Sequence, residues 1–375
     1  MLDLITEQQN IFFPQAEILT EDEKHWIVDP KNPDNPFSGI IGQEGAVTKL
    51  CRLAYQALGE SDHFAGEVST ALLGPPGTGK TTLARMFAKL IALPFINVNP
   101  KAIKTTEDIF DAIQRELVKH KVRHSHTGEV VTLKMSPKDD PYRYCAPCCV
   151  VFIDEVHQLP SGVEQGLLTA TESNTATMET PSGKIIDTAN ICWVIATTDR
   201  GMLFDAFDSR FSKVLLKPYN QDEIARIIQV SKPEIPLEVC KLIATYSSSV
   251  TREAIDFATE VIHQLDMAGG SWQDAVEQIR VEQGIDELGM SETRLNILVA
   301  LGQRGPIAIG KLANVARVKE EELRKYTLAP MEVISDDREA LVQPSGRGYW
   351  ITEQGLKELD ARGLSHRGVE VLPKR

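Results

Sequence analysis

The sequence has no apolar run approaching the roughly 18–20 residues that a membrane-spanning helix needs. Its first residues, Met1 to Asn10, carry acids and no basic segment ahead of an apolar one, which argues against a secretory signal. Its six cysteines, three of them crowded between 145 and 149, do not form the spaced framework of a small secreted domain. We therefore expect a chain that works in the reducing cytoplasm.

Positive charge is also in short supply. The 40 Lys and Arg residues face 53 Asp and Glu residues, which gives a formal net charge of −13. Because contacts with phosphates need Lys and Arg, this balance disfavours nonspecific binding of polyanions, and any contact with nucleic acid must be local. With 375 residues, 42% of them hydrophobic, the chain is expected to fold into two or three ordinary globular domains.

The first half of the chain divides into an extension and an α/β domain. Residues 1–35 are polar and end in a run rich in Pro and Asn, so we expect an extension outside any core. Residues 36–218 alternate short apolar runs with helical patterns, which predicts a parallel sheet with helices on both faces. The expected strands are Thr70–Leu73, Phe95–Val98, Cys149–Ile153, Ile191–Ala196 and Val214–Leu216.

The second half is mainly helical. Asn220 and Glu223 have the spacing of a capping box, and residues 219–285 predict a small all-helical domain. Residues 286–375 predict a winged-helix domain, in which three helices precede two strands joined by a turn. The expected elements are the helices Ser291–Leu301, Ile309–Ala316 and Lys319–Tyr326, the strands Ala340–Gln343 and Tyr349–Thr352, and the turn Pro344–Gly348.

A glycine-rich motif follows the first expected strand. The segment Gly74-Pro75-Pro76-Gly77-Thr78-Gly79-Lys80-Thr81 fits the pattern G-x-x-x-x-G-K-[ST] and opens a helical pattern from Thr81 to Ile91. Its glycines would let backbone N–H groups surround a phosphate at the positive end of the helix. Lys80 would then contact the β- and γ-phosphates, and the Thr81 hydroxyl would ligate Mg²⁺. We expect ATP and Mg²⁺ as cofactors.

Two acids end the expected strand Cys149–Ile153. Asp154 is the residue type that holds Mg²⁺ beside a phosphate loop, and Glu155 is the type that polarises an attacking water. Taken alone, both could be solvated acids at a strand end. Together with the phosphate loop, they predict a site for ATP hydrolysis.

The motifs resemble those of the AAA+ ATPases and, among them, those of the RuvB family of Holliday-junction branch-migration motors. The resemblance covers roughly residues 36–362. The matching segments are Ile40-Ile41-Gly42-Gln43, Gly74–Thr82, Phe152-Ile153-Asp154-Glu155-Val156-His157, Ile195-Ala196-Thr197-Thr198, Asp208-Ser209-Arg210-Phe211 and Val250-Thr251-Arg252.

The resemblance implies roles for further residues. Thr198 would be the polar sensor that orients the lytic water. Arg210 would be the arginine finger that enters the site of the next subunit, and Arg252 would be the second sensor, which closes on the γ-phosphate. His157 is more often a packed or hydrogen-bonded residue than a catalytic one, and we leave it outside the site. The residues expected to bind the nucleotide are Ile40 and Ile41 at the adenine and Gly74, Pro75, Pro76, Gly77, Thr78, Gly79, Lys80, Thr81, Thr82 and Arg252 at the phosphates.

An arginine finger also implies an assembly of identical subunits. Because finger and pocket would belong to different subunits, a closed ring supplies every site with a finger, and the resemblance implies a homo-hexamer. Such a finger contributes about 10³–10⁵ in rate in related chemistry.

The substrate of the motion is expected to be DNA. Arg347, between Gly346 and Gly348, would let the tip of the wing approach a phosphate or the minor groove. Against this, Glu320–Glu322 fall in the helix expected to read the groove, and their charges repel DNA. An ATP-driven DNA translocase or remodeler is therefore the expected function. The alternatives are a protein-directed AAA+ remodeler or switch, with the winged helix as a protein dock, and a clamp-loader-like subunit.

Three segments depart from the RuvB pattern: the long residues 1–35, an insertion at about 120–148, and a shortened hairpin at Ser173–Asp187. In that family the hairpin engages RuvA, so its shortening counts against a RuvA-type partner. The insertion reads as a loop without a core, in which two His and a C-x-x-C pair could hold Zn²⁺, although such residues are more often incidental. These are His124, His126, Cys145 and Cys148. The basic residues of the insertion could face DNA or only solvate the loop; they are Lys121, Arg123, Lys134, Lys138 and Arg143.

Overall fold

The computed structural model describes residues 25–59, 68–123, 130–132, 134–138, 140–172, 175–198, 210–247, 250–332 and 339–366. The chain forms two compact units. The sheet unit comprises Met1–Gly74 and Gly79–Leu216, and the helical unit comprises Pro75–Thr78 and Lys217–Arg375. None of the described helices is long and apolar enough to cross a membrane.

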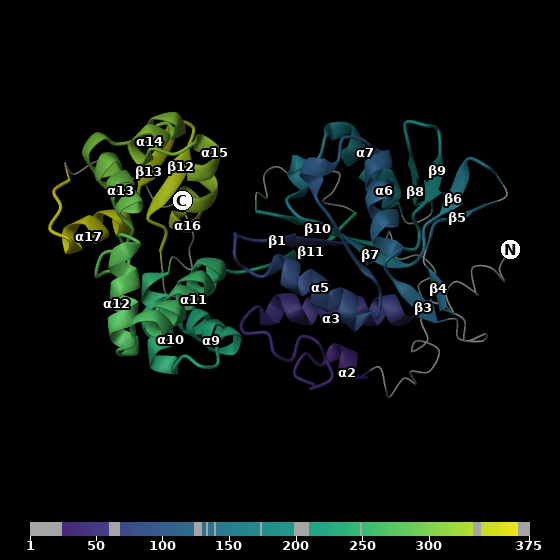
Figure 1. Cartoon of the computed structure of the whole chain (residues 1–375). Coiled ribbons are helices and arrows are strands. Elements are labelled where there is room, and N and C mark those ends of the chain that lie inside the picture. The colour runs from purple at the N-terminus through teal and green to yellow at the C-terminus, as the bar shows by residue number, and fades with distance from the viewer. Residues whose placement is uncertain are drawn as a thin grey trace. The chain divides into compact units, whose positions relative to one another are not determined.

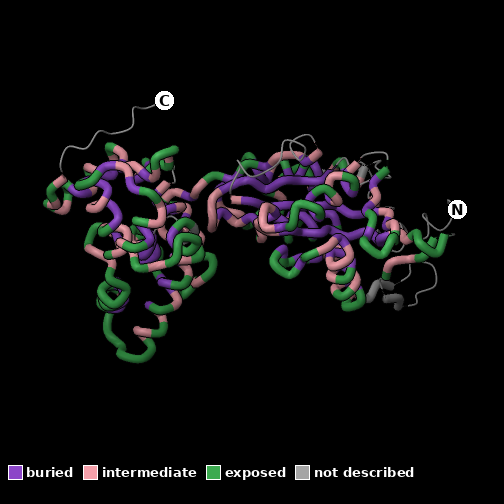
Figure 2. The backbone as a smooth tube through the Cα atoms, turned by 90° about the horizontal axis from the view of Figure 1, so that it is seen from above, coloured by how far each residue is buried: buried purple, intermediate pink, exposed green. Residues whose placement is uncertain are grey.

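A five-stranded parallel sheet organises the sheet unit (Figure 1). The strands lie in the order β11-β1-β10-β7-β2. Every residue of β1, β7 and β10 is buried, and Figure 2 shows the strands of this unit as largely purple tube. This burial matches the continuous apolar runs in the sequence. The predicted parallel sheet is confirmed, with bounds of Thr70–Leu73 (β1), Phe95–Val98 (β2), Cys149–Ile153 (β7), Ile191–Thr197 (β10) and Ser212–Leu215 (β11).

Helices cover both faces of this sheet, with α3 and α5 on one face and α6 and α7 on the other (Figure 1). Helix α6 begins at a capping box, in which Thr105 and Asp108 each accept a hydrogen bond from the other's backbone N–H. Short 3-10 turns follow β2 and β7. The bounds are Glu44–Gly59 (α3), Lys80–Leu90 (α5), Thr106–Leu117 (α6), Ser161–Ala170 (α7), Pro100–Ala102 (η1) and Val156–Gln158 (η2).

Residues 25–35 belong to the core, and their assignment to an extension is wrong. Helix α2 (His25–Val28) places Ile27 in the core of the sheet unit with none of its surface exposed. The buried Asn35 amide donates to the carbonyl oxygens of Trp26, Ile27 and Asp29 at 3.3, 3.1 and 3.1 Å. One side chain thus satisfies three backbone acceptors of a turn-rich segment and fixes it against the core. Residues 1–24 lie outside the described part of the chain.

The insertion contributes strands to two further sheets instead of forming a loop without a core. Strand β3 (Lys121–Arg123) pairs with β4 (Val130–Thr132), and β5 (Ser136–Pro137) pairs with β6 (Arg143–Cys145). Strand β6 runs parallel to β9 (Ile185–Asp187), which forms a hairpin with β8 (Thr177–Glu179). Strands β5, β6, β9 and β8 form one four-stranded sheet in that order. Part of the insertion and the short hairpin therefore belong to the same sheet.

Four helices of the helical unit pack around one hydrophobic cluster. Asn220 and Glu223 form the predicted capping box, with the Glu223 N–H donating to Asn220 Oδ1 at 2.8 Å and the Asn220 N–H to Glu223 Oε2 at 2.9 Å. A second capping box, Ser271 with Asp274, starts the last of these helices. The bounds are Gln221–Ser231 (α9), Leu237–Tyr246 (α10), Thr251–Ala268 (α11) and Trp272–Glu282 (α12).

A separate cluster holds the C-terminal elements together, in the predicted order of helices followed by a hairpin. The third predicted helix is not regular, because a π-helical stretch separates two short α-helical pieces. The bounds are Glu292–Arg304 (α13), Ile309–Ala316 (α14), Glu320–Glu322 (α15), Leu323–Leu328 (η4), Ala329–Met331 (α16), Val342–Ser345 (β12), Gly348–Ile351 (β13) and Glu353–Ala361 (α17). The boundary at residues 285 and 286 stays a prediction.

The hairpin turn is tighter than predicted. Ser345 pairs with Gly348, so only Gly346 and Arg347 form the turn, and Pro344 lies within β12. Proline is tolerated there because β12 is an edge strand. The Ser345 hydroxyl closes the turn by accepting from the Trp350 indole at 2.8 Å and donating to the Gly348 carbonyl at 2.8 Å.

Gly348 offers a test of this hairpin. Its φ is +116°, and a Cβ atom would overlap the Ile307 carbonyl and lie 2.7 Å from the Ala308 nitrogen. We expect Gly348→Ala to lower the free energy of unfolding by about 2 kcal/mol or more, since unfavourable backbone conformations cost about 1–3 kcal/mol each. Urea unfolding measures this. Gly346→Ala is the matched control, because a Cβ there meets no atom within 4 Å. Equal losses in both variants would contradict the packing described.

Candidate functional site

The loop between β1 and α5 has the backbone of an anion site. Gly77 and Gly79 adopt φ values of +76° and +85°, which favour glycine. The N-cap residue of α5 is Gly79, which has no side chain with which to cap the first N–H groups of that helix. Such N–H groups, together with the helix dipole, favour a phosphate.

Lys80 is held beneath this loop. Its side chain is buried, and Nζ donates a hydrogen bond to the Gly74 carbonyl oxygen at 2.8 Å. Burial lowers the pKa of the Lys80 ammonium, and the negative charges of Glu155 and Asp154 oppose that shift. The Gly74 N–H in turn donates to the Thr197 carbonyl oxygen at 3.4 Å. The start of the loop is therefore tied to the end of β10.

Asp154 and Thr81 form an oxygen-rich pair next to Lys80. The Thr81 hydroxyl lies 3.5 Å from Asp154 Oδ2. Burial raises the pKa of Asp154, the charge of Glu155 raises it further, and Lys80 opposes both. Two carboxylates and a hydroxyl near one lysine favour a hard divalent cation, which would relieve the repulsion between the acids. Thr81 and Asp154 are thus the residues suited to hold Mg²⁺.

Glu155 is fixed by the residues that follow β10. Its φ of +52° is unusual for a residue other than glycine. The Thr198 hydroxyl lies 3.1 and 3.0 Å from the two carboxylate oxygens, and the Thr198 N–H donates to Oε2 at 3.1 Å. The structure therefore brings the predicted sensor and the predicted general base together.

His157 belongs to the same group, although the sequence predicts it outside the site. Its Nδ1 lies 2.9 Å from Thr197 Oγ1 and 3.5 Å from Glu155 Oε2. The sequence carries two signals for this grouping: His157 stands two residues after Glu155, and one threonine ends β10 while another follows it. Spacing alone did not reveal which threonine each side chain would meet.

Arg210 contacts α7 and Glu172, which lies just after the end of that helix. Its Nη1 donates to the Leu168 carbonyl oxygen at 2.5 Å and lies 3.1 Å from Glu172 Oε1. Hydrogen bonds from Thr175 and Arg210 lower the pKa of Glu172. Glu172 is therefore an ion-pair partner that the sequence did not predict. Asp208 and Ser209 lie outside the described residues.

The start of α11 is bonded to the phosphate loop within the helical unit. The Thr251 hydroxyl donates to the Gly77 carbonyl oxygen at 2.7 Å, and the Tyr219 hydroxyl donates to the Thr78 carbonyl oxygen at 3.3 Å. Arg252, the next residue of α11, is exposed. Its role at the γ-phosphate stays a prediction. The same is true of Ile40 and Ile41 at the adenine, where both side chains are half-buried.

The chain is similar to known AAA ATPases and RuvB proteins. Residues 70–219 match the "ATPase family associated with various cellular activities (AAA)". The Holliday junction branch migration complex subunit RuvB of Bdellovibrio bacteriovorus is 28% identical over 353 residues, which cover 89% of this chain and 94% of that protein. The structure of a Thermotoga maritima RuvB mutant is 25% identical, covers 88% of this chain and 98% of that one, and has a TM-score of 0.65. Residues 70–219 are thus similar to AAA ATPases, and the chain as a whole is similar to RuvB.

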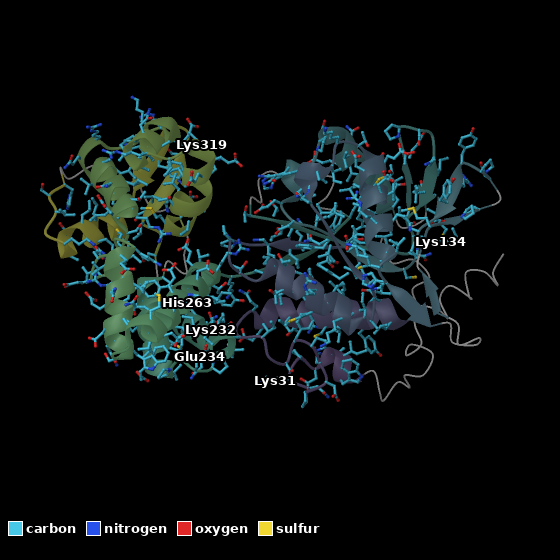
Figure 3. The ribbon with its side chains drawn as sticks, in the orientation of Figure 1. Lys31, Lys134, Lys232, Glu234, His263 and Lys319 are labelled. Carbon is cyan, nitrogen blue, oxygen red and sulfur yellow. The ribbon has the colours of Figure 1, made fainter. Side chains whose placement is uncertain are left out.

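The basic residues that could contact DNA differ in exposure and in their partners. Arg347 is exposed at the tip of the β12–β13 hairpin. In the insertion, Arg143 and Lys134 are exposed, and Lys134 is labelled in Figure 3. Lys138 instead forms an ion pair with Asp187 of β9. For Lys121 and Arg123 the structure describes the backbone strand and not the side chains.

The cysteines of the insertion do not form an open zinc pair. Cys148 is buried in the core of the sheet unit, and burial raises the pKa of its thiol to about 12. A zinc ligand must be a thiolate, which such burial disfavours. Among the described residues no group of three or more His, Cys, Asp and Glu side chains could hold a metal ion, while His124 and His126 lie outside them.

Lys80 provides the direct test of the phosphate site. We expect Lys80→Ala to abolish ATP turnover and to weaken ATP binding at least tenfold. The substitution removes the positive charge that the Lys80 ammonium, bonded to the Gly74 carbonyl oxygen, holds at the phosphate loop. Phosphate release and calorimetric titration measure the two effects. Lys89→Ala, an exposed lysine in the last turn of the same helix, is the control and should behave as the parent. Unchanged turnover by Lys80→Ala would overturn the site.

Proposed function

We propose that this protein is an ATP-driven DNA motor of the branch-migration type. The observation that carries the proposal is the bonding of Glu155 to Thr198 beside Lys80 and Asp154, which is the arrangement needed to activate water next to a bound triphosphate. The RuvB relatives support the DNA half of the proposal, because they match the chain across both of its units.

In the proposed reaction, a water molecule attacks the γ-phosphorus of ATP. Glu155 accepts the water's proton, and the bond between the γ-phosphorus and the oxygen of the departing ADP breaks. Thr198 holds the Glu155 carboxylate, and Lys80 offsets the charge of the phosphates. Thr81 and Asp154 would hold Mg²⁺, which would supply positive charge beside the phosphates.

We propose a homo-hexameric ring in which Arg210 completes the site of the next subunit. The guanidinium is half-buried and already bonded within its own subunit to Glu172 and the Leu168 carbonyl, which would orient it. A ring gives every pocket one such arginine, whereas a lone chain would lack it.

Mixing two inactive variants tests the shared site. Lys80→Ala removes the pocket but keeps the finger, and Arg210→Ala does the reverse. We expect each alone to be inactive and a 1:1 mixture to regain up to about a quarter of the parent rate, since about a quarter of the interfaces in a randomly mixed ring join two intact halves. Phosphate release measures the rate. No recovery in subunits shown to co-assemble by native mass spectrometry would argue that Arg210 acts within its own chain.

Protein-directed remodelling is the second candidate, and one observation favours it. Glu320, Glu321 and Glu322 are all exposed at the start of the third C-terminal helix, where they would repel DNA phosphates. The hairpin with Arg347 remains the better candidate for DNA. We do not propose a RuvA-type partner, because the edge of β9 is already paired with β6 of the insertion.

DNA stimulation separates these functions. We expect four-way junction DNA to raise the ATPase rate several-fold at low salt and to lose this effect as salt increases. Arg347→Ala should need about three to ten times more DNA for half-maximal stimulation, as expected when one charged contact worth about 1 kcal/mol is removed. Lys357→Ala, which removes an exposed charge from α17, is the matched control. A rate indifferent to junction, duplex and single-stranded DNA would favour the protein-directed function.

A further inference from the structure

We propose that His157 is a positioning residue, which holds the Glu155 carboxylate in its productive orientation and couples it to the phosphate loop. The inference rests on the proposed role of Glu155 in ATP hydrolysis. In the Asp-Glu-Val-His segment, Asp154 is suited to hold Mg²⁺ and Glu155 to activate water, while His157 has no assigned role in either.

The backbone brings His157 back toward the acid that precedes it. Glu155, in the left-handed region, caps the 3-10 turn Val156–Gln158, and the buried Val156 anchors that turn in the core of the sheet unit. The turn is closed by a hydrogen bond from the Gln158 N–H to the Glu155 carbonyl oxygen at 2.9 Å. Because the turn is fixed at both places, the His157 ring has a defined position against the end of β10.

Two threonines complete a chain of contacts. Thr197 is fully buried, and its hydroxyl lies 2.9 Å from His157 Nδ1. Thr198 holds both oxygens of Glu155, and His157 Nδ1 lies 3.5 Å from Oε2. The contacts therefore run from Thr197 through His157 and Glu155 to Thr198, and the carboxylate is approached from two directions.

The chemistry of the groups gives His157 a direction of action. A carboxylate only accepts hydrogen bonds, so a favourable contact with Oε2 requires the hydrogen on Nδ1. That one hydrogen is shared, because the Thr197 hydroxyl oxygen accepts it at 2.9 Å and Oε2 attracts it from 3.5 Å. Removing the imidazole would leave Oε2 bonded from the Thr198 side alone, and the carboxylate could turn away from the water. Misplacement of a reacting group by about 1 Å can cost about 100-fold in rate.

The same contacts reach the phosphate loop. Lys80 donates to the Gly74 carbonyl, and the Gly74 N–H donates to the carbonyl of Thr197, whose hydroxyl meets His157. A shift of the loop that accompanies phosphate binding would therefore act on His157 through Thr197. Through this path, the orientation of the Glu155 carboxylate would depend on whether a nucleotide occupies the phosphate loop.

The test compares His157→Ala with His157→Asn, whose amide nitrogen takes the place of Nδ1. We expect His157→Ala to lower kcat about tenfold or more, with the KM for ATP and the affinity for a nonhydrolysable ATP analogue within about twofold of the parent. His157→Asn should regain at least half of the lost rate. His263→Ala, an exposed histidine of α11 labelled in Figure 3, is the control and should match the parent.

A second pair of variants covers the case in which His157→Ala folds poorly. Thr197→Val removes only the buried hydroxyl, so kcat should fall in the same direction, and Thr197→Ser should restore it. The inference is overturned if His157→Ala and Thr197→Val both keep the parent kcat, if His157→Asn is as slow as His157→Ala, or if analogue affinity falls in step with kcat. Glu155→Gln distinguishes failure of the His157 inference from failure of the proposed function. Normal turnover in that variant would refute the role of Glu155 itself.

Discussion

The parallel pairing of β1, β10 and β7 determines where the catalytic groups lie. Leu73 is in register with Thr197, and Ile195 is in register with Ile153, so the three strands end at one edge of the sheet. The phosphate loop, the two acids and Thr198 follow those ends directly. Because every residue of these strands is buried, a register slip by one residue would exchange the packed faces and misplace the site. The stability of the core and the geometry of the site therefore depend on the same pairing.

The sequence predicted this sheet well because buried parallel strands leave a strong pattern. The bounds of β1, β2 and β7 agree with the apolar runs, and the capping box at Asn220 marks the start of α9. The failures have physical causes. A one-turn helix such as α2 has no periodicity to detect, and the fixing of residues 25–35 depends on Asn35, whose amide reaches three carbonyls. Strands of two or three residues, as in the insertion, also leave no pattern.

Motifs identified the residue types of the candidate site but not their partners. Lys80, Asp154, Glu155 and Thr198 could be predicted because each follows or opens an element with a clear pattern. The partnership of Arg210 with Glu172 could not, since it joins residues 38 positions apart that no local sequence pattern links. The partners of His157, which the sequence predicts only to be packed or hydrogen-bonded, could not be predicted for a similar reason. Its importance depends on Thr197, a buried hydroxyl that resembles any other strand residue until the pairing of β10 with β7 is known.

The charge balance of the site explains why such a protein would act as a motor. Among the described residues of the sheet unit, Lys80 is the cation whose charge acts on Asp154, an arrangement that suits a magnesium ion but leaves little positive charge for the γ-phosphate. A further expected cation is Arg210, which would serve a neighbouring subunit. In the proposed ring, full stabilisation of the transition state would therefore require two subunits to come together. Hydrolysis would relax that requirement, because the γ-phosphate that draws the cations together is lost. The shortage of positive charge within one unit is thus what would convert cleavage of ATP into movement.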